Sequence, residues 1–431
     1  MLFVIGMTVT ATVLLVLLRG FFIRHPILTA RKTLRALRRG GRRPLMALLL
    51  AMAGTLGVGN LTGVALGIMV GGAGSVLWIA VASVLACVLK YAEGVLATDM
   101  RSPEGGGMMW VVRRVLPFGR YVAAGYAAVC LLVALSMGAI LQSRAVAEAA
   151  EAAYGFETLP VAVGLAVLLC TVIVGGISRI ERAVAVTVPL AAGCYILLCA
   201  AALVMNAHAL PSALARIVCE AFSAQGVTGG VLGFLTSRAL REGFSGGLLS
   251  NEAGAGTSAL AHARSDAADA VDEGLLGMCE VAVDTLLCLL TGLCLVTCGG
   301  EVPSVGMRSP MGWLSRTLTD TLGAWCGGVL FFCVFAFAFS TVICWYYYGQ
   351  SCLGYLSGKR WFLPYAAVFT LAVTLGGVLP SHVAVLLTDV GLYILFAITQ
   401  GALLCASDRL RDLHRAAFFP KRRRSPQIRQ K

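Results

Sequence analysis

Two stretches of membrane length are each interrupted by glycine and small polar residues, and these interruptions are where the chain could bind a polar ligand. The first covers residues 54–63, with the sequence GTLGVGNLTG. The second covers residues 250–258, with the sequence SNEAGAGTS, and follows the glycine-rich run Gly226–Leu249. In hydrocarbon an unpaired backbone N–H or C=O group costs several kcal/mol, so unwound backbone survives only beside a polar cavity or ligand. Paired interruptions in the two halves of a chain are typical of a transporter's midplane site.

The chemistry of such a site follows from the ends of the half-helices. Free N–H groups of the restarted half-helix form a positive pole, and free carbonyls of the ended one form a negative pole. A zwitterionic amino acid could use both poles, and Na⁺ could bind carbonyl and hydroxyl oxygens. Gly57, Gly59 and Gly63 would let the backbone approach a ligand closely, while Asn60 and Thr62 could bond backbone or substrate. The alternative is that these glycines form a packing surface or a kink, and the matched second interruption favours binding.

The composition indicates the class of protein that holds these interruptions. Of 431 residues, 58% are hydrophobic and 13% are charged. A soluble domain carries roughly a quarter charged residues, so this is a polytopic membrane protein. The net charge of +13 is concentrated in residues 24–43 and 409–431, which predicts cytoplasmic segments, and a tail that could touch anionic lipid, rather than a nucleic-acid partner.

Hydrophobic windows predict a leading helix at about residues 2–22 and ten further spans. These ten are residues 44–71, 73–99, 118–148, 158–177, 183–206, 228–264, 271–298, 319–350, 361–379 and 382–406. An even number of spans places both strongly basic segments on the cytoplasmic side. We therefore expect a multi-pass protein of a bacterial inner (cytoplasmic) membrane, with the N-terminus outside and the C-terminus in the cytoplasm.

The interruptions fall in the first and sixth of the ten spans. Because five is odd, the second set of five spans enters the membrane from the opposite face, as in inverted-repeat transporters. The prediction is an all-α polytopic membrane protein with a 5+5 inverted repeat, broken helices one and six, and one extra N-terminal helix, about 11 transmembrane helices in all. The expected segments are an extra helix (1–23), a basic cytoplasmic segment (24–43), two five-helix repeats (44–206 and 207–406) and a basic cytoplasmic tail (407–431).

Further motifs follow one another between about residues 45 and 355. They are GVGNLTGVA at 57–65, KYAE at 90–93, GGISRI at 175–180, GLLSNEAGAGT at 247–257, AHA at 261–263, Glu280 with Asp284, and AFSTVICWYYYG at 338–349. This series resembles the alanine or glycine:cation symporter family, and SNEAGAG and FST…WYYYG are its most specific parts. The resemblance implies a LeuT-like fold and uptake of small neutral amino acids with Na⁺, or with H⁺ in some members, without an organic cofactor.

The chain departs from the family pattern at several positions. The family commonly has Thr where Val58 stands, and Asn in span three at the places of Ala139 and Arg144. It usually carries a Pro-Asn pair where this chain has Thr399 and Gln400. Losing polar groups at these places could change the choice of substrate or ion. Arg144 could instead face the acidic loop at residues 148–157.

The resemblance also implies site residues. Ser340 and Thr341 lie on the eighth span, which faces the first interruption in a LeuT-like fold. Their hydroxyls, with carbonyls around Gly54 and Gly57, are the expected Na⁺ site, since hard cations take oxygen ligands. The alternative is that both hydroxyls bond the preceding helical turn. Gln142 could contact substrate or join two helices.

The expected substrate site combines both interruptions. Small residues beside them suit a small side chain such as that of alanine or glycine. The full set of expected substrate-binding residues is Gly57, Gly59, Asn60, Thr62, Gly63, Gln142, Ser250, Asn251, Gly254, Gly256 and Thr257.

Carboxylates within spans are candidates for gating or coupling, because a mid-bilayer charge costs several kcal/mol unless it is paired. The candidates are Glu252, Glu280, Asp284 and Asp389. Glu252 could face substrate or a gate, or cap the restarted half-helix, and the structural role is favoured. Glu280 and Asp284 are spaced i,i+4 and share a helix face. They could relay protons, but pairing with Arg238 or Arg241 is favoured.

Two other polar positions are given structural roles. Lys90 and Glu93 are spaced i,i+3 near the end of span two, so we expect them to pair with each other. We expect His262 to lie at a helix end rather than to bind a metal.

The favoured function is secondary active symport by alternating access. An H⁺-coupled carrier or an amino-acid exchanger is the main alternative, and a sensor that binds amino acids without transport is a lesser one. A channel would want a ring of filter carbonyls and usually oligomeric symmetry, which one chain with two interruptions does not suggest. An enzyme is disfavoured because the sequence contains no HExxH motif and no paired catalytic aspartates in the context of a membrane protease. The oligomeric state stays open.

Overall fold

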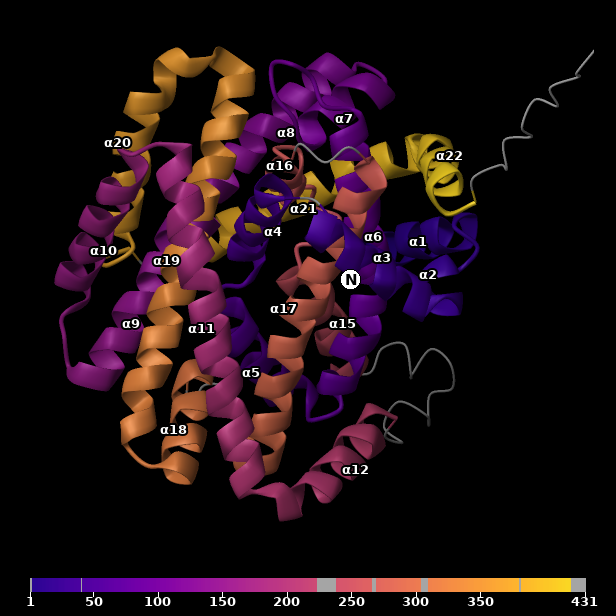
Figure 1. Ribbon diagram of the computed structural model, residues 1–431. Helices are drawn as coiled ribbons and strands as arrows, with labels where there is room; N and C mark the ends of the chain where they lie inside the picture. The colour runs from indigo at the N-terminus through magenta and orange to yellow at the C-terminus, as the bar shows by residue number, and fades with distance from the viewer. Residues whose placement is uncertain are drawn as a thin grey trace, which may run out of the picture.

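The computed structural model describes residues 2–39, 41–222, 238–265, 269–303, 309–379 and 381–419, and these residues form an all-helical protein without named strands (Figure 1). Seven of the described helices are long and apolar enough to cross a membrane: Arg42–Gly71, Ser75–Asp99, Gly119–Tyr154, Ile177–Met205, Ala270–Cys298, Trp325–Ser357 and His382–Cys405. Val4–Leu17 and Thr158–Ile173 are shorter apolar helices. The predicted all-α polytopic class is confirmed.

Both predicted helix breaks are present. Helix α4 (Arg42–Thr55) and helix α5 (Gly59–Gly71) are separated by residues 56–58. Helix α15 (Arg238–Ser250) and helix α16 (Ala259–His262) are separated by residues 251–258. Helix α5 packs beside α15 and α4 beside α16, so the two broken helices run antiparallel (Figure 1). Of the glycine-rich run and the sixth predicted span, residues 226–237 lie outside the described residues.

Two unbroken helices complete a bundle around the broken ones. Helix α6 (Ser75–Asp99) packs against α15, and helix α17 (Ala270–Cys298) packs against α6, α4 and α5. Glycine permits the close approach of α6 and α17, because a Cβ at Gly274 would lie 2.4 Å from Val95 Cγ2 and 2.7 Å from the Tyr91 carbonyl. We call α4, α5, α6, α15, α16 and α17 the broken-helix bundle.

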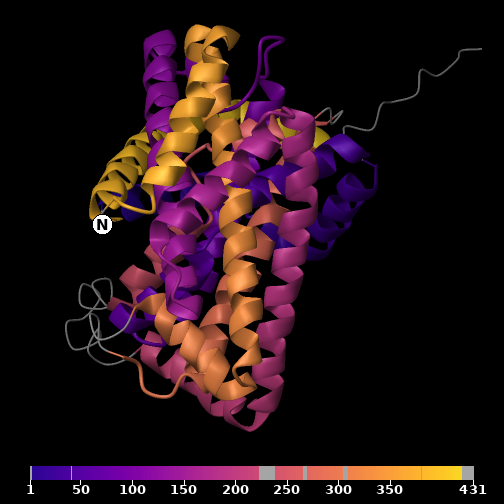
Figure 2. The same cartoon turned by 90° about the vertical axis from the view of Figure 1, so that its left-hand side faces the viewer.

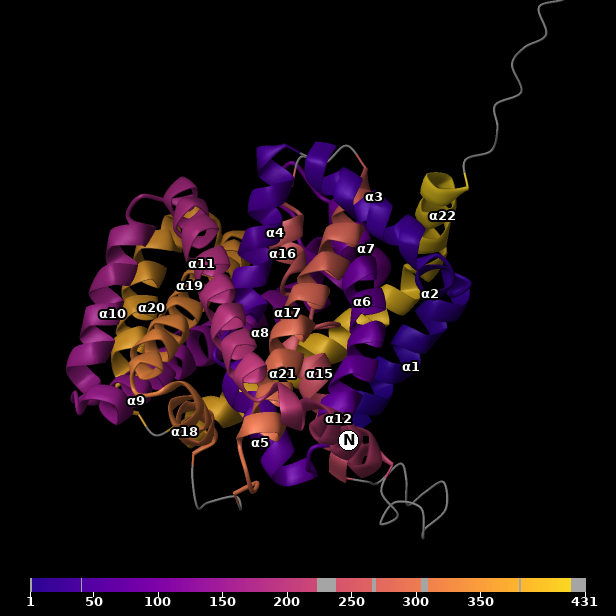
Figure 3. The same cartoon turned by 60° about the horizontal axis from the view of Figure 1, so that its bottom comes forward.

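A second group of helices lies beside this bundle (Figure 3). It consists of α8 (Gly119–Val133), the π-helical turn η1 (Ala134–Leu141), α9 (Gln142–Tyr154), α10 (Thr158–Ile173), α19 (Trp325–Ser357) and α20 (Phe362–Leu375). The long helix α11 (Ile177–Met205) runs along α19 (Figure 2). Gly138 fits η1 against α19, since a Cβ there would lie 2.2 Å from Trp345 Cβ. In α9, Arg144 pairs with Glu148 at 2.6 Å, so it faces the acidic segment as expected.

The chain termini form a layer on the bundle. Helix α1 (Leu2–Leu17) ends earlier than the predicted residue 22, because Arg19 and Gly20 adopt left-handed backbone and end the helix before α2 (Phe21–Arg24). The basic segment forms α3 (Pro26–Arg39), which packs on α17. Helix α21 (Ser381–Cys405) leads to α22 (Ser407–Phe418), which lies beside α1 (Figures 1 and 3). Residues 420–431 of the predicted tail lie outside the described residues.

Three connecting helices were not predicted as separate elements. They are α7 (Met108–Val115), α12 (Leu210–Ala221) and α18 (Pro310–Leu322). The predicted eighth span began at residue 319, but residues 319–322 belong to α18, which packs on α5 and α19. Single turns also occur at η2 (Ala207–Ala209) and η3 (Lys359–Trp361). The division into two five-helix repeats stays a prediction.

Candidate functional site

Three membrane helices converge on the first break. Thr341 Oγ1 of α19 lies 3.4 Å from the Leu56 carbonyl and 2.9 Å from the Phe337 carbonyl of its own helix. A Cβ at Gly57 would lie 3.3 Å from Thr341 Oγ1 and 3.7 Å from both polar side-chain atoms of Gln142. Hydroxyl, amide and unwound carbonyl therefore meet beside Gly57. The sequence placed Thr341 and Gly57 in the Na⁺ site and gave Gln142 either substrate contact or a link between helices, and these roles stay predictions.

The other two residues of the expected Na⁺ site lie differently. Ser340 is fully buried, and its hydroxyl donates to the Phe337 carbonyl at 2.9 Å. That bond to the preceding turn is the alternative geometry considered for both hydroxyls. Gly54 packs against Tyr348, whose Oη would lie 3.0 Å from an added Cβ. The described contacts thus join Thr341, but not Ser340 or Gly54, to the unwound residues of the first break.

Asp284 of α17 links the two breaks. Its Oδ1 accepts a 2.6 Å hydrogen bond from Asn60 Nδ2 at the start of α5. Its Oδ2 accepts a 2.6 Å bond from Ser250 Oγ at the end of α15. Asn60 is 1% exposed, and its Oδ1 has no hydrogen-bond partner among the described residues. That oxygen is a free acceptor beside the first break.

Side chains of α8 and α21 hold the carbonyls of the second break. The Ala255 carbonyl accepts bonds from Tyr126 Oη at 2.9 Å and Thr399 Oγ1 at 3.0 Å. The Gly254 carbonyl accepts a 3.3 Å bond from Gln400 Nε2. The sequence marked Thr399 and Gln400 as departures without giving them a role. The signal in the sequence that could have indicated this role is the presence of two adjacent polar residues in an apolar span.

Glycine is required where this segment turns. Gly254 and Gly256 have φ values of 89° and 74°, in the left-handed region that favours glycine. A Cβ at Gly254 would lie 2.1 Å from Gln400 Nε2, and one at Gly256 would lie 2.7 Å from Met108 Cγ. Glu252 also has a positive φ of 47°. The unwound segment is therefore held in one conformation by its neighbours.

A buried ionic network lies beside the second break. Lys90 Nζ is 2.8 Å from Glu280 Oε1 and donates to Ser258 Oγ at 2.8 Å. His262, the last residue of α16, has Nε2 3.2 Å from Glu280 and Nδ1 3.0 Å from Glu273. These five side chains are at most 1% exposed. The network fixes α16 to α6 and α17.

Two predicted ion pairs are wrong. Glu280 pairs with Lys90 rather than with Arg238 or Arg241, and Arg241 instead lies 3.2 Å from Glu242. Lys90 therefore does not pair with Glu93. The physical reason is that Lys90 points across to α17 and not along its own helix.

Two more buried carboxylates contact the second break. Glu93 Oε1 accepts a 3.2 Å bond from the Gly256 N–H. Glu252 Oε2 accepts a 2.6 Å bond from the Thr257 hydroxyl, so the described bond is to a side chain and not a backbone cap of α16. Glu93 Oε2 and Glu252 Oε1 have no hydrogen-bond partner among the described residues. In the described part of the chain, no group of three or more His, Cys, Asp or Glu could hold a metal ion.

The remaining predicted site residues make fewer contacts with the unwound segments of the two breaks. Gly59 and Gly63 are exposed, and an added Cβ at either would meet no atom within 4 Å. The Thr62 hydroxyl bonds the Val58 carbonyl at 3.0 Å, and Asn251 Nδ2 bonds the Gly247 carbonyl at 2.7 Å. Asp389 is exposed on α21, and no described contact joins it to either break.

Two antiparallel broken helices, with unwound segments joined by polar residues of neighbouring helices, define a multi-pass membrane transporter of LeuT-like fold. The chain belongs to the sodium:alanine symporter family, whose sequence profile matches residues 1–421. This is a family of transporters rather than enzymes, and it supports cation-coupled amino-acid symport.

Individual relatives agree with this assignment. The sodium/alanine symporter AgcS of Methanococcus maripaludis is 32% identical over 340 residues, covering 77% of this chain and 74% of AgcS. An uncharacterized transporter of Haemophilus influenzae is 31% identical over 355 residues, covering 80% of this chain and 76% of the relative. The probable sodium/glutamine symporter GlnT of Bacillus subtilis is 29% identical, covering 74% of this chain and 66% of GlnT.

Solved structures show the same fold at low sequence identity. A substrate-bound, outward-open Na⁺-coupled sialic acid symporter is 13% identical, with a TM-score of 0.58, covering 95% of this chain and 87% of the symporter. A manganese transporter of Eremococcus coleocola is 14% identical, with a TM-score of 0.50, covering 84% of this chain and 76% of that transporter.

Proposed function

We propose that this protein transports a small neutral amino acid such as alanine or glycine, together with Na⁺, across a bacterial inner membrane. The observation that carries the proposal is the meeting of the Leu56 carbonyl, the Thr341 hydroxyl and Gln142 around Gly57. Carbonyl and hydroxyl oxygens are the ligands that a hard cation such as Na⁺ takes. The printed name of AgcS, a sodium/alanine symporter, supports the same ion and substrate.

The amino acid would lie between the two breaks. Its carboxylate would face the N-terminal end of α5, which is the positive pole of that helix. Its ammonium group would face Asn60 Oδ1 and Asn251 Oδ1, which are buried acceptors without a hydrogen-bond partner among the described residues. Gly254 and Gly256 leave little room for a large side chain nearby. The remaining proposed substrate contacts are Gly57, Gly59, Thr62, Gly63, Gln142, Ser250 and Thr257.

Coupling would follow from alternating access. The broken-helix bundle would move against α8–α10, α19 and α20, and bound substrate and Na⁺ would each favour the same states. Asp284 is placed to transmit occupancy of one break to the other, because it bonds Asn60 and Ser250. The positive-inside rule places the N-terminus outside and the C-terminus in the cytoplasm.

Proton coupling or exchange is the second candidate, and the buried charges favour it. Five carboxylates (Glu93, Glu252, Glu273, Glu280 and Asp284) are at most 1% exposed, and among the described residues Lys90 and His262 are the buried bases that contact this group. An excess of buried negative charge must be offset by a proton or a cation. Glu252 is the proposed gating or proton-carrying group, since one of its oxygens has no partner in the described structure.

Uptake into liposomes distinguishes these candidates. Purified protein would be reconstituted, and labelled alanine and glycine would be followed under an inward Na⁺ gradient, an inward K⁺ gradient or an inward proton gradient. Accumulation above equilibrium with the Na⁺ gradient alone is the expected result. Accumulation driven only by the proton gradient would mean that H⁺ rather than Na⁺ is the coupling ion. Counterflow without either gradient would indicate an exchanger.

A further inference from the structure

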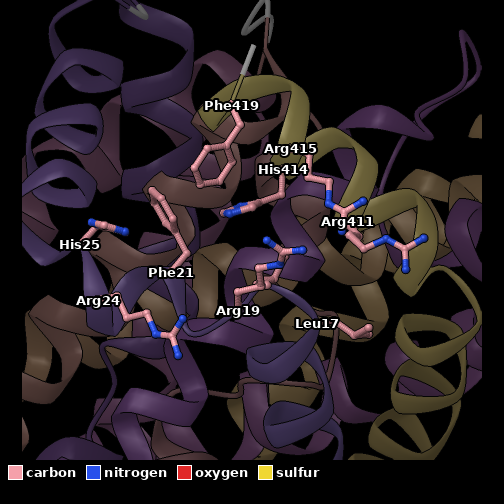
Figure 4. Close-up of a pocket in the computed structure, with 10 residues that line it drawn as sticks. Leu17, Arg19, Phe21, Arg24, His25, Arg411, His414, Arg415 and Phe419 are labelled. Atoms are coloured by element: carbon pink, nitrogen blue, oxygen red, sulfur yellow. The ribbon is translucent and has the colours of Figure 1, made fainter. Parts of the chain in front are cut away.

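A basic cavity lies where the end of α1 and helix α2 meet the terminal helix α22, away from both helix breaks. It has a volume of about 430 Å³ and opens between the end of α1, the short helix α2 and the terminal helix α22 (Figure 4). Four arginines and two histidines line it together with apolar side chains, and no carboxylate does. The full lining is Leu17, Leu18, Arg19, Phe21, Arg24, His25, Arg411, His414, Arg415 and Phe419.

The positive charge of this cavity is largely unneutralised. Arg19, Arg24 and Arg415 form no ion pair with any carboxylate of the described residues. The charge of Arg411 is partly neutralised, because its Nη2 lies 2.8 Å from Asp408 Oδ1 on the same helix. Asp99 of α6 is held 2.9 Å from Arg409. The cavity therefore offers several guanidinium groups to an outside anion.

A buried histidine adds a directed hydrogen-bond donor. His414 is only 3% exposed, and its Nδ1 lies 2.9 Å from the Tyr91 hydroxyl. Its Nε2 has no hydrogen-bond partner among the described residues. When Tyr91 donates to Nδ1, the neutral ring carries its hydrogen on Nε2 and can donate it to an anionic oxygen. A buried donor without a partner is otherwise unfavourable, which points to a ligand.

The wall of the cavity is anchored to the rest of the protein. Lys32 of α3 donates to the Ala417 carbonyl of α22 at 2.6 Å, and its Nζ lies 3.8 Å above the Phe418 ring. The Phe21 and Phe418 ring centroids are 4.3 Å apart. Helix α22 is thus held in place by contacts other than the cavity arginines.

The surroundings are those of a membrane interface. One face of α1 exposes Ile5, Val9, Val13 and Val16, as a lipid-facing helix does, and the cavity lies at the end of this helix. The adjoining helix α3 exposes apolar side chains and is otherwise basic, which is typical of a helix lying at the headgroup level. The cavity lining combines apolar side chains with arginines, as binding of an acyl chain and its phosphate requires.

We infer that this cavity binds the phosphate group of an anionic phospholipid, with Arg19, Arg24 and Arg415 as the charged contacts and His414 as a neutral donor. Bound lipid would join α1–α2 to α22 and stabilise the layer that the termini form on the bundle. Arginine suits this role because its planar donor fork matches phosphate oxygens.

The test compares lipid binding by the full chain and two variants of equal charge change. Wild-type protein in a neutral detergent would be titrated with phosphatidylglycerol, with phosphatidylcholine and with inorganic phosphate, and bound lipid would be counted by native mass spectrometry. The cavity variant is Arg19→Gln with Arg415→Gln. The matched control is Arg114→Gln with Arg120→Gln, two exposed arginines outside the cavity.

The inference predicts phosphatidylglycerol binding preferred over phosphatidylcholine, about 30-fold weaker in the cavity variant and unchanged in the control. Equal weakening in both variants would overturn it, because the effect would then be general electrostatics. Millimolar inorganic phosphate could instead displace phosphatidylglycerol and stabilise the protein equally. That result would assign the site to free phosphate and overturn the inference that it binds a lipid. Arg415→Lys keeps the positive charge. If this variant also fails to elute as a monodisperse protein, the loss of binding is recognised as misfolding.

Discussion

The buried pair of Lys90 and Glu280 gives a prediction whose size follows from its surroundings. The two charged atoms are 2.8 Å apart, and each side chain is 1% exposed. At an effective dielectric constant of about 20, their attraction is about 6 kcal/mol before desolvation is counted. Removing one partner of a buried pair typically costs about 3–5 kcal/mol of stability. Because Glu280 would keep His262 as a partner, we expect Lys90→Met to cost about 3 kcal/mol.

The matched control is an ion pair of similar length at the surface. Arg216 and Glu220 are 2.7 Å apart, but their side chains are 41% and 34% exposed. Such a pair contributes about 0.2–1 kcal/mol, so Arg216→Met should have a much smaller effect. Thermal unfolding of the purified variants, followed by tryptophan fluorescence and size exclusion, measures the difference.

The double variant separates the cost of an unpaired buried charge from the loss of the ion pair itself. Lys90→Met together with Glu280→Met removes both charges and leaves His262 bonded to Glu273, so most of the lost stability should return. If Lys90→Met and Arg216→Met lowered the unfolding midpoint equally, or if the double variant were less stable than Lys90→Met, burial of the pair would not control its contribution.

Two further predictions concern a backbone turn and a terminal helix. Gly254→Ala should abolish alanine uptake in liposomes, since φ is 89° and the new Cβ would lie 2.1 Å from Gln400 Nε2, while Gly193→Ala, where nothing lies within 4 Å, should leave uptake unchanged. Burial, with a smaller effect from Lys32, lowers the pKa of His414 to about 4, below its unfolded value of about 6.5. The docked state then binds fewer protons than the released one, so protection of α22 from hydrogen exchange, corrected for the intrinsic pH dependence of exchange, should be full above about pH 6.5 and lost as the pH falls toward 4.

Each of these has a contradicting result. Normal uptake by Gly254→Ala would mean that the second break need not hold its left-handed turn. The acid response should shrink in His414→Phe and persist in His208→Phe, which changes a histidine remote from α22. An identical acid response in both variants would assign it to other groups.

Several span boundaries and both breaks could be predicted because the signals are local. The predicted span 44–71 corresponds to α4 and α5 at Arg42–Gly71, and 271–298 corresponds to α17 at Ala270–Cys298. Glycine and polar residues inside an apolar run mark unwound backbone wherever the fold places it. The leading helix was predicted too long because its end depends on left-handed backbone at Arg19, a residue that rarely adopts it.

The partners of buried charges could not be predicted, because they depend on how whole helices are rotated. Lys90 and Glu280 are 190 positions apart, and an apolar helix buried on most sides gives no periodic signal for the direction of one lysine. The role of Thr399 and Gln400 could not be predicted for the same reason, because these side chains bond the carbonyls of Ala255 and Gly254 in a distant part of the sequence.

The cavity of the termini was also outside the reach of the sequence. The basic character of residues 24–43 and 409–431 predicted contact with anionic lipid in general terms. That α22 returns to α1 and α2 and encloses a cavity between them follows only from tertiary packing.

We propose that the Thr341 hydroxyl, with the Leu56 carbonyl of the first break, binds the coupling Na⁺. We would measure the Na⁺ activation curve of alanine uptake in liposomes for Thr341→Val and for Thr187→Val, a control whose hydroxyl, among the described contacts, bonds the Ala183 carbonyl of its own helix at 2.9 Å. Loss of one oxygen ligand to a charged ion is worth about 1.5–3 kcal/mol, so Thr341→Val should require at least about tenfold more Na⁺. The control should match the wild type. An unchanged Na⁺ requirement in Thr341→Val, with uptake intact, would contradict the account and place the coupling ion elsewhere.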